Sequence, residues 1–165
     1  MDKLPEDIKQ EALSYIRGYE RRRKIYRQKY YEIINSSPAA FTIAEADGEM
    51  IHIYNGHSNI PGNPTANKAL QLAQLEQHPD TIKMRAVEQA KKDIGADVAD
   101  DDVRQRLINA LWINCLSGRC HPFEHLNLTE FSRMDFYSRK HKFLRDISDN
   151  FIKLSSKLVL CTQKP

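Results

Sequence analysis

The sequence predicts a mainly α-helical protein with a small β-hairpin, and three observations support this fold class. Apolar residues recur at helical spacing over most of the 165 residues. Proline and glycine interrupt that spacing at a few positions, as they do between helices. One short segment instead alternates apolar and polar residues, as a strand does. We expect residues 1–62 to hold a long helix and the hairpin, and residues 63–165 to form a helical bundle that contains a helix-turn-helix.

The first domain is expected to begin with one long helix over residues 5–35. Pro5 and Glu6 suit the first turn of a helix, and Pro38 disfavours helix in the residue before it. Between them, residues spaced by four and three are typical of a heptad seam. The seam predicts either a short coiled coil or a helix packed on the rest of the protein. Its positions are Ile8, Ala12, Tyr15, Tyr19, Arg22, Tyr26, Lys29 and Ile33.

Residues 41–54 carry the strand pattern. Two alternating runs flank Asp47-Gly48, a pair that favours a two-residue hairpin turn because both turn positions need positive φ. An isolated hairpin is marginally stable, so this one is expected to lean on helices. The following segment "NGHSNIPGNPT" is rich in turn residues and predicts a linker, which sets the domain boundary.

The second domain contains local signals that begin and end helices. Pro79 separates two helical patterns, Gly95 suits a helix C-terminus, and Gly118 ends a third pattern. Ser132 is a good N-cap, and Asp135 three residues later completes a capping box. The helices are expected over 66–77, 80–94, 101–117, 122–127 and 133–154.

Charge is unevenly distributed around a net value of +3. Residues 17–29 hold seven bases and one acid (+6), residues 132–145 hold five bases and one acid (+4), and residues 37–101 hold five bases and ten acids (−5). Two basic blocks around an acidic middle indicate a polyanion contacted at two places. We expect no membrane span and no signal peptide, and three unpatterned cysteines indicate a reducing cytoplasm.

The last helix is the main candidate site, a DNA-binding surface. A buried stripe is expected at Phe136, Phe143, Leu144, Ile147 and Phe151, which leaves a polar face rich in donors. Arginine can read guanine, serine and histidine can reach base edges, and lysine neutralises phosphates. The alternative is an ordinary amphipathic helix with a solvated face. The candidate DNA-binding residues are Arg133, Met134, Tyr137, Ser138, Arg139, Lys140, His141, Lys142 and Arg145.

Other groupings favour structural interpretations. The segment "YERRRKIYRQKYY" (residues 19–31) could follow a phosphate backbone, but its tyrosines fit the heptad better. A zinc site is one interpretation of Cys115, Cys120, His121 and His125, and we favour a buried thiol and a helix-capping histidine. A magnesium site is one interpretation of Asp97, Asp100, Asp101 and Asp102, and we favour acids placed at a helix start. No catalytic or nucleotide-binding motif occurs, so we expect no enzyme and no cofactor.

The segments "KMRAVEQAKKDIG", "LINALWIN" and "GRCHPFEHLNLTEFSRMDFYSRKHKFLRDISDNF" resemble phage and prophage late-gene transcription regulators of the RinA/ArpU type. The resemblance covers roughly residues 80–154, and its main feature is Ser132 opening an aromatic and basic helix. It implies a sigma-factor-like helix-turn-helix, sequence-specific binding to double-stranded DNA, activation of late genes through RNA polymerase, and no enzymatic chemistry. It also implies a bacterial cytoplasmic protein associated with the nucleoid. The N-terminal third lies outside the resemblance.

Two functional hypotheses follow. In the first, the protein is a DNA-binding transcription regulator whose N-terminal helix forms a homodimer or docks on a partner. In the second, it is an oligomeric interaction or assembly protein, such as a small DNA-packaging adaptor or a polymerase-binding modulator. Its basic C-terminal helix would then meet an acidic protein.

Overall fold

The computed structural model describes residues 4–35, 42–46, 49–53, 64–117 and 121–162. The chain forms two compact units, one of Met1–Lys24 with Gln77–Pro165 and one of Ile25–Glu76. The expected boundary between residues 62 and 63 lies inside the second unit. The reason is that the first helix of the chain packs with the C-terminal helices, a long-range contact that sequence composition does not reveal.

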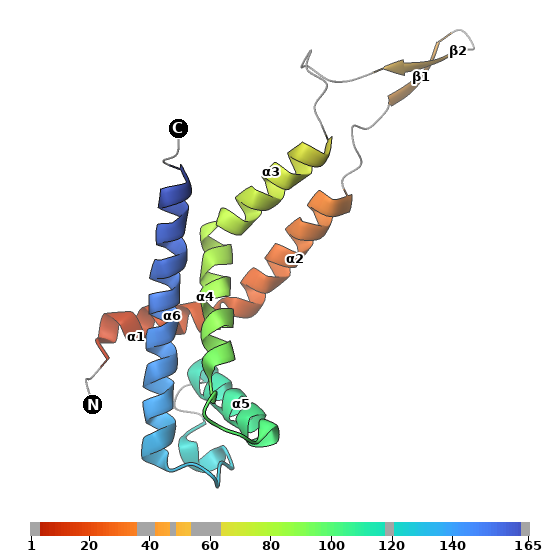
Figure 1. The fold of residues 1–165 in the computed structure, drawn as a ribbon. Coiled ribbons are helices and arrows are strands. Elements are labelled where there is room, and N and C mark those ends of the chain that lie inside the picture. Colours follow the sequence, from red (N-terminus) through yellow and green to blue (C-terminus); the bar gives the residue numbers. More distant parts are fainter. Residues whose placement is uncertain (1–3, 36–41, 47–48, 54–63, 118–120, 163–165) are drawn as a thin grey trace. The chain divides into compact units, whose positions relative to one another are not determined.

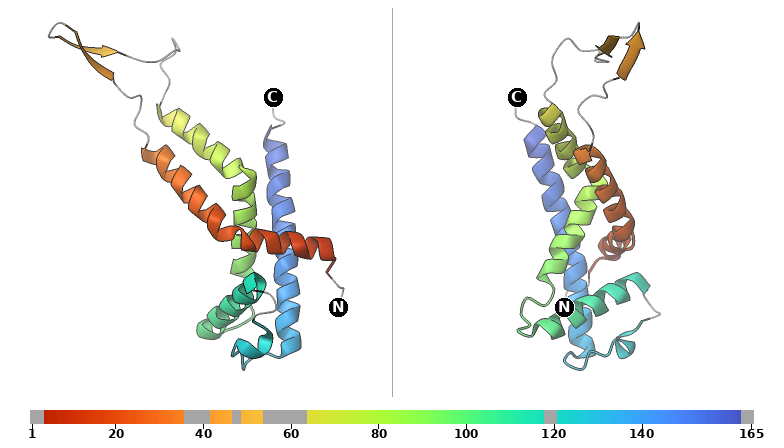
Figure 2. Two further views of the ribbon diagram at one scale, coloured as in Figure 1. Left: turned by 180° about the vertical axis from the view of Figure 1, so that it is seen from behind. Right: turned by 90° about the vertical axis from the view of Figure 1, so that its right-hand side faces the viewer.

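The first unit is a helical assembly built from both ends of the chain. It contains α1 (Glu6–Arg17), α4 (Pro79–Asp93), α5 (Asp101–Ser117), the short 3₁₀ helix η2 (Phe123–His125) and α6 (Arg133–Thr162). α4 and α6 lie side by side and antiparallel, and α1 crosses them (Figures 1 and 2). α1 also packs against α5. The mainly α-helical class is therefore confirmed.

The core of this unit lies where these helices meet. The completely or almost completely buried side chains include Ile16, Met84, Val87, Leu107, Leu111, Phe136, Phe143, Leu144 and Ile147. The stripe predicted on the last helix is thus buried at four of its five positions, and Phe151 is partly exposed while its ring contacts Tyr15 at 5.2 Å between centroids. Burial of such side chains supplies most of the stabilisation of a domain this size.

The prediction of one helix over residues 5–35 is wrong, because the helix is interrupted at Gly18. α1 ends at Arg17, and α2 runs from Tyr19 to Asn35. Glycine is the least favourable residue after proline inside a helix, and here it leaves room for a side chain. A Cβ atom on Gly18 would lie 2.5 Å from Nη1 of Arg22, which donates to the carbonyl oxygen of Tyr15 at 3.0 Å.

The second unit contains the rest of α2, strands β1 (Thr42–Ala46) and β2 (Glu49–Ile53), and most of α3 (Pro64–Gln77). The strands pair antiparallel, with Thr42 opposite Ile53; the turn residues Asp47 and Gly48 lie outside the described residues. Nζ of Lys68 on α3 donates to the carbonyl oxygen of Ile34 on α2 at 2.8 Å. The linker expected after the hairpin also lies largely outside the described residues.

Local signals predicted most helix boundaries of the first unit. Pro79 is the first residue of α4, Gly95 follows α4 with a φ of +64°, and α5 has the predicted bounds. The short helix expected over 122–127 is a single 3₁₀ turn, Phe123–His125. α6 continues beyond residue 154 to Thr162, since no glycine or proline occurs before Pro165. Within the described residues, no helix is long and apolar enough to cross a membrane.

Candidate nucleic-acid interface

α6 begins where the sequence predicts, because its first turn is capped. Oγ of Ser132 accepts a hydrogen bond from the backbone N–H of Asp135 at 3.1 Å, as an N-cap serine does. The Asp135 carboxylate lies in the first turn, near the positive end of the helix dipole. The cap fixes the first turns of α6, which carry the candidate residues.

The inner face of these turns is anchored by aromatic packing. Phe136 and Phe143 are buried, and the ring of Phe136 lies 5.4 Å from that of Phe123 in η2. Leu128, in the connection between η2 and α6, is also buried. α6 therefore cannot rotate about its own axis without exposing two phenylalanines, and its outer face has a defined direction.

That outer face carries a hollow of about 420 Å³. Met134 is 78% exposed, and the Arg133 side chain is 69% exposed. Two further cations, Lys142 and Arg145, are exposed farther along the helix. The hollow thus places hydrogen-bond donors around an accessible apolar floor. The residues that line it are Arg133, Met134, Tyr137, Ser138 and His141.

The cations on this face make weak, solvent-exposed pairs. Arg133 lies 3.1 Å from Glu124, and Lys142 lies 2.7 Å from Asp146. The Arg133 guanidinium is also 6.0 Å from the centre of the Tyr137 ring. Exposed ion pairs contribute about 0–1 kcal/mol, so both cations can exchange these partners for a phosphate or a base edge.

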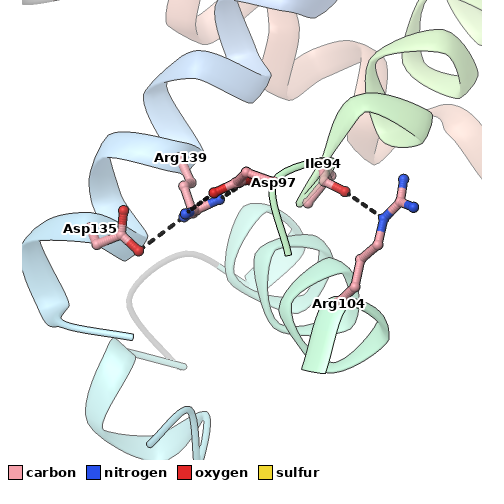
Figure 3. Close-up of polar contacts among 5 residues, drawn as sticks. All are labelled: Ile94, Asp97, Arg104, Asp135 and Arg139. Atoms are coloured by element: carbon pink, nitrogen blue, oxygen red, sulfur yellow. Dashed lines mark hydrogen bonds and ion pairs between the residues drawn. The ribbon is translucent and has the colours of Figure 1, made fainter. Parts of the chain in front are cut away.

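Arg139 differs, because its guanidinium is fully engaged within the unit. It donates to both carboxylate oxygens of Asp97, at 2.8 and 2.6 Å, and to Asp135 at 2.9 Å (Figure 3). Its other neighbour is the Phe131 ring, 5.3 Å away. The hydrogen bond from Arg139 lowers the pKa of Asp97 to about 2, and the same bond raises the pKa of Arg139. Arg139 therefore ties α6 to the connection between α4 and α5.

A second arginine holds that connection in place. Arg104 on α5 donates to the carbonyl oxygen of Ile94 at 3.0 Å (Figure 3). It also donates to the carbonyl oxygen of Lys92 at 2.7 Å. Gly95 has positive φ, and a Cβ atom there would lie 3.1 Å from Cγ of Arg104. Glycine therefore allows the chain to turn closely over Arg104 and present Asp97 to α6.

Lys140 also faces inward. Its Nζ donates to Oδ1 of Asn114 at 2.6 Å, and Nδ2 of Asn114 donates to the carbonyl oxygen of His121 at 2.6 Å. Asn114 is 2% exposed, and burial lowers the pKa of Lys140. This pair of bonds joins α5, the segment after it and α6.

The structure therefore divides the nine predicted residues into two groups. Seven lie on the accessible side of α6, whereas Arg139 and Lys140 have internal partners that make them positioning residues. Sequence reasoning missed those partners, Asp97 and Asn114, and the supporting Arg104. In the sequence, Asp97 looks like an acid placed near a helix start. Asn114 is signalled only by being a polar residue inside an apolar stripe. The accessible residues are Arg133, Met134, Tyr137, Ser138, His141, Lys142 and Arg145.

Some of the residues considered as metal ligands have structural roles. Oδ1 of Asp100 accepts from the backbone N–H groups of Asp102 and Val103 at 2.8 and 3.2 Å, so it caps α5. Cys115 is buried and free, and burial raises its pKa to about 11. Cys120 lies outside the described residues. No cluster of three metal-ligating side chains occurs among the residues that are described.

Comparison with family models, with curated proteins and with solved structures finds no match for this chain.

Proposed function

We propose that the protein is a sequence-specific DNA-binding transcription regulator that reads the duplex with the outer face of α6. The observation that carries this proposal is a capped helix with an anchored inner face and accessible donors on its outer face. A recognition helix needs this combination, because its first turns enter the major groove while its rear packs on a scaffold. α5, η2 and α6 follow one another in the order of a helix-turn-helix.

The proposed arrangement departs from the usual motif in one respect. A helix-turn-helix joins its two helices by a turn of about three or four residues, whereas residues 126–132 separate η2 from α6 here. Asn127 in this connection has a φ of +49°, a conformation that asparagine tolerates better than most residues. We propose that η2 stands in for the first helix of the motif and that this longer turn replaces the short one.

Roles follow from chemistry and exposure. Arg133 and His141 are proposed to read base edges, with Ser138 between them and Met134 in apolar contact with a thymine methyl group. Lys142 and Arg145 are proposed to bind phosphates, which position the protein without reading sequence. Arg139 and Lys140 are proposed to position α6 rather than touch DNA. Activation through RNA polymerase rests only on the resemblance to phage regulators.

The test begins with selection of duplexes from fragmented bacterial or phage DNA by the purified protein. Arg133→Ala and His141→Ala should each lower the preference for the selected duplex over random duplex by about 5- to 150-fold, since a base contact contributes roughly 1–3 kcal/mol. Lys142→Ala should weaken binding to both duplexes equally. Lys153→Ala, which removes an exposed base later on the same helix, is the control and should change neither. If no duplex is enriched, the proposal fails.

A homodimer is proposed for the second unit. Within residues 25–35 and 65–76 of its helices only Leu75 is buried, while Ile25, Tyr31 and Leu70 are 44%, 62% and 59% exposed. So much accessible apolar surface on a small helical unit is typical of an association site. The same surface also supports the assembly-protein alternative. Light scattering separates the two: a dimer favours regulation, and a large closed ring favours assembly.

A further inference from the structure

A second cationic surface lies on the first unit, where α1 meets α2. Arg17, Arg21 and Lys24 are spaced by four and three residues, so they share one side of the helical path. Backbone hydrogen bonds of 3.1 Å from Gly18 to Ser14 and from Arg22 to Gly18 keep helical pairing across the interruption. All three cations are exposed, and we call them the outer stripe.

The opposite side of the same path is held inside the unit. Tyr15 and Tyr19 are buried, and the hydroxyl of Tyr19 donates to Glu88 on α4 at 3.1 Å. Nε of Arg22 donates to Asp80 at 3.1 Å, and the Arg22 side chain is only 11% exposed. These contacts fix the rotation of the helical path about its axis, so the outer stripe must face away from the core.

The outer stripe is also electrostatically unneutralised. Within the described part of the chain, none of its three side chains forms an ion pair with a carboxylate. Seven other cations of the first unit do pair with an acid, namely Lys9, Arg22, Arg85, Arg106, Arg133, Arg139 and Lys142. Arg17 further contributes, after burial and together with Lys9, to lowering the pKa of Lys140 on α6. The charge of Arg17 therefore acts on the inner side of α6, where Lys140 binds Asn114.

We propose that Arg17, Arg21 and Lys24 form a second contact to duplex DNA, one that binds backbone phosphates irrespective of sequence. The choice of DNA as the polyanion rests on the function proposed for α6. Seven residues of helix span about 10 Å, so the outer stripe is long enough to meet two or three phosphates of a duplex, which carries one charge per roughly 1.7 Å of its axis.

An anionic membrane suits this surface less well. A helix that lies on a membrane inserts an apolar face beside its cationic face. Here the apolar face, with Tyr15 and Tyr19, is buried against the protein's own helices. A phosphate backbone needs only the cations and is therefore the better match.

The test is the salt dependence of duplex binding by the full chain. In the variant Arg17→Gln/Arg21→Gln/Lys24→Gln, the slope of log affinity against log salt should become shallower by about two to three, since each phosphate contact contributes about 0.9. Affinity should fall by the same factor for selected and random duplexes. The matched control Lys92→Gln/Lys153→Gln/Lys157→Gln also removes three exposed charges and should leave the slope unchanged. Glutamine nearly equals lysine and arginine in helix propensity, so folding should be preserved in both.

Three outcomes would overturn the inference. The slope could stay unchanged in the outer-stripe variant, or affinity could fall only for the selected duplex. Alternatively, the wild type could bind phosphatidylserine vesicles through the outer stripe while its DNA slope does not depend on it. Failure of the α6 proposal has a different signature: Arg133→Ala and His141→Ala would keep full discrimination while the outer-stripe variant still lost salt-dependent affinity.

Discussion

At the scale of single residues, cations that look alike in the sequence differ in what they contact. Arg133 and Arg139 lie on the same helix six residues apart, yet Arg133 pairs with one exposed carboxylate and Arg139 with two carboxylates. A bidentate arginine–carboxylate pair has a defined geometry as well as a favourable energy. Arg139 is therefore suited to fixing the direction of α6, and Arg133 is suited to exchanging partners.

The contact between Arg139 and Asp97 predicts a specific loss of stability in acid. The folded pKa of Asp97 is about 2, whereas an unfolded aspartate has a pKa of about 3.9. Between these values the unfolded chain binds a proton that the folded protein does not, so stability falls as pH decreases from about 4 to about 2. Urea unfolding across this range should show a shallower decrease for Asp97→Asn than for the wild type.

The control for this experiment is Asp93→Asn, which removes an exposed carboxylate at the end of α4, four residues before Asp97. Asp93 has no ion pair among the residues that the structure describes. Its substitution should leave the acid dependence as in the wild type. Equal pH dependence of the wild type and Asp97→Asn would show that the contact with Arg139 does not exist in solution.

At the scale of elements, the junction of α1 and α2 shows how one glycine changes a long helix. Periodicity continues through residue 18, so the sequence alone predicts an uninterrupted seam. Because glycine has no side chain, the Arg22 guanidinium occupies the space where a Cβ atom would lie. The guanidinium donates to the carbonyl oxygen of Tyr15 on α1 and to the carboxylate of Asp80 on α4. The interruption therefore depends on a contact between residues 58 positions apart, which local propensity cannot reveal.

Alanine at position 18 should consequently be unfavourable, although it favours helix elsewhere. Gly18 has φ −87° and ψ −1°, which alanine can adopt, and the usual gain would be about 0.5–1 kcal/mol. A Cβ atom would displace Arg22, however, and lost hydrogen bonds to a charged group cost about 1.5–3 kcal/mol. Chemical denaturation should show Gly18→Ala to be destabilised by roughly 1 kcal/mol.

The double variant tests this cause directly. When Arg22→Ala is already present, Gly18→Ala should become stabilising, so the coupling between the two positions should be at least about 1 kcal/mol. Ser14→Ala, an exposed position on α1, should be neutral or slightly stabilising. An additive pair of effects at positions 18 and 22 would contradict the assigned role of the glycine.

At the scale of the whole molecule, the sequence predicted what is locally encoded. Ser132 and the stripe through Phe136 and Phe143 are signals within a few turns of one helix, and each has its expected place. The contacts that orient α6 join residues 42 and 26 positions apart, Arg139 with Asp97 and Lys140 with Asn114. Such pairings depend on how helices pack. The sequence could therefore locate the candidate site, but it could not tell the accessible residues from those with internal partners.

The division into units makes a final prediction, that the first unit folds without the second. Of the second unit's helical residues 25–35 and 65–76, only Leu75 is buried, at 8% exposed, whereas the first unit holds a continuous set of buried side chains. The bond between Arg22 and Asp80 also places the ends of the excised segment close together on that unit. Replacing residues 25–76 by a flexible linker of about six glycine and serine residues, with a typical span of roughly 13 Å, should therefore leave the core intact.

Circular dichroism should show cooperative thermal unfolding of the shortened chain, while its affinity for the selected duplex should fall at equal protomer concentration, because the homodimer proposed for the second unit is lost and a dimer gains affinity by holding two recognition helices on one duplex. Phe143→Ala in the shortened chain is the control, because removing a buried phenylalanine costs about 3–5 kcal/mol and should abolish most of that transition. A shortened chain without cooperative unfolding would mean that the second unit stabilises the first. A folded chain that keeps wild-type affinity would instead contradict the homodimer proposed through residues 25–76.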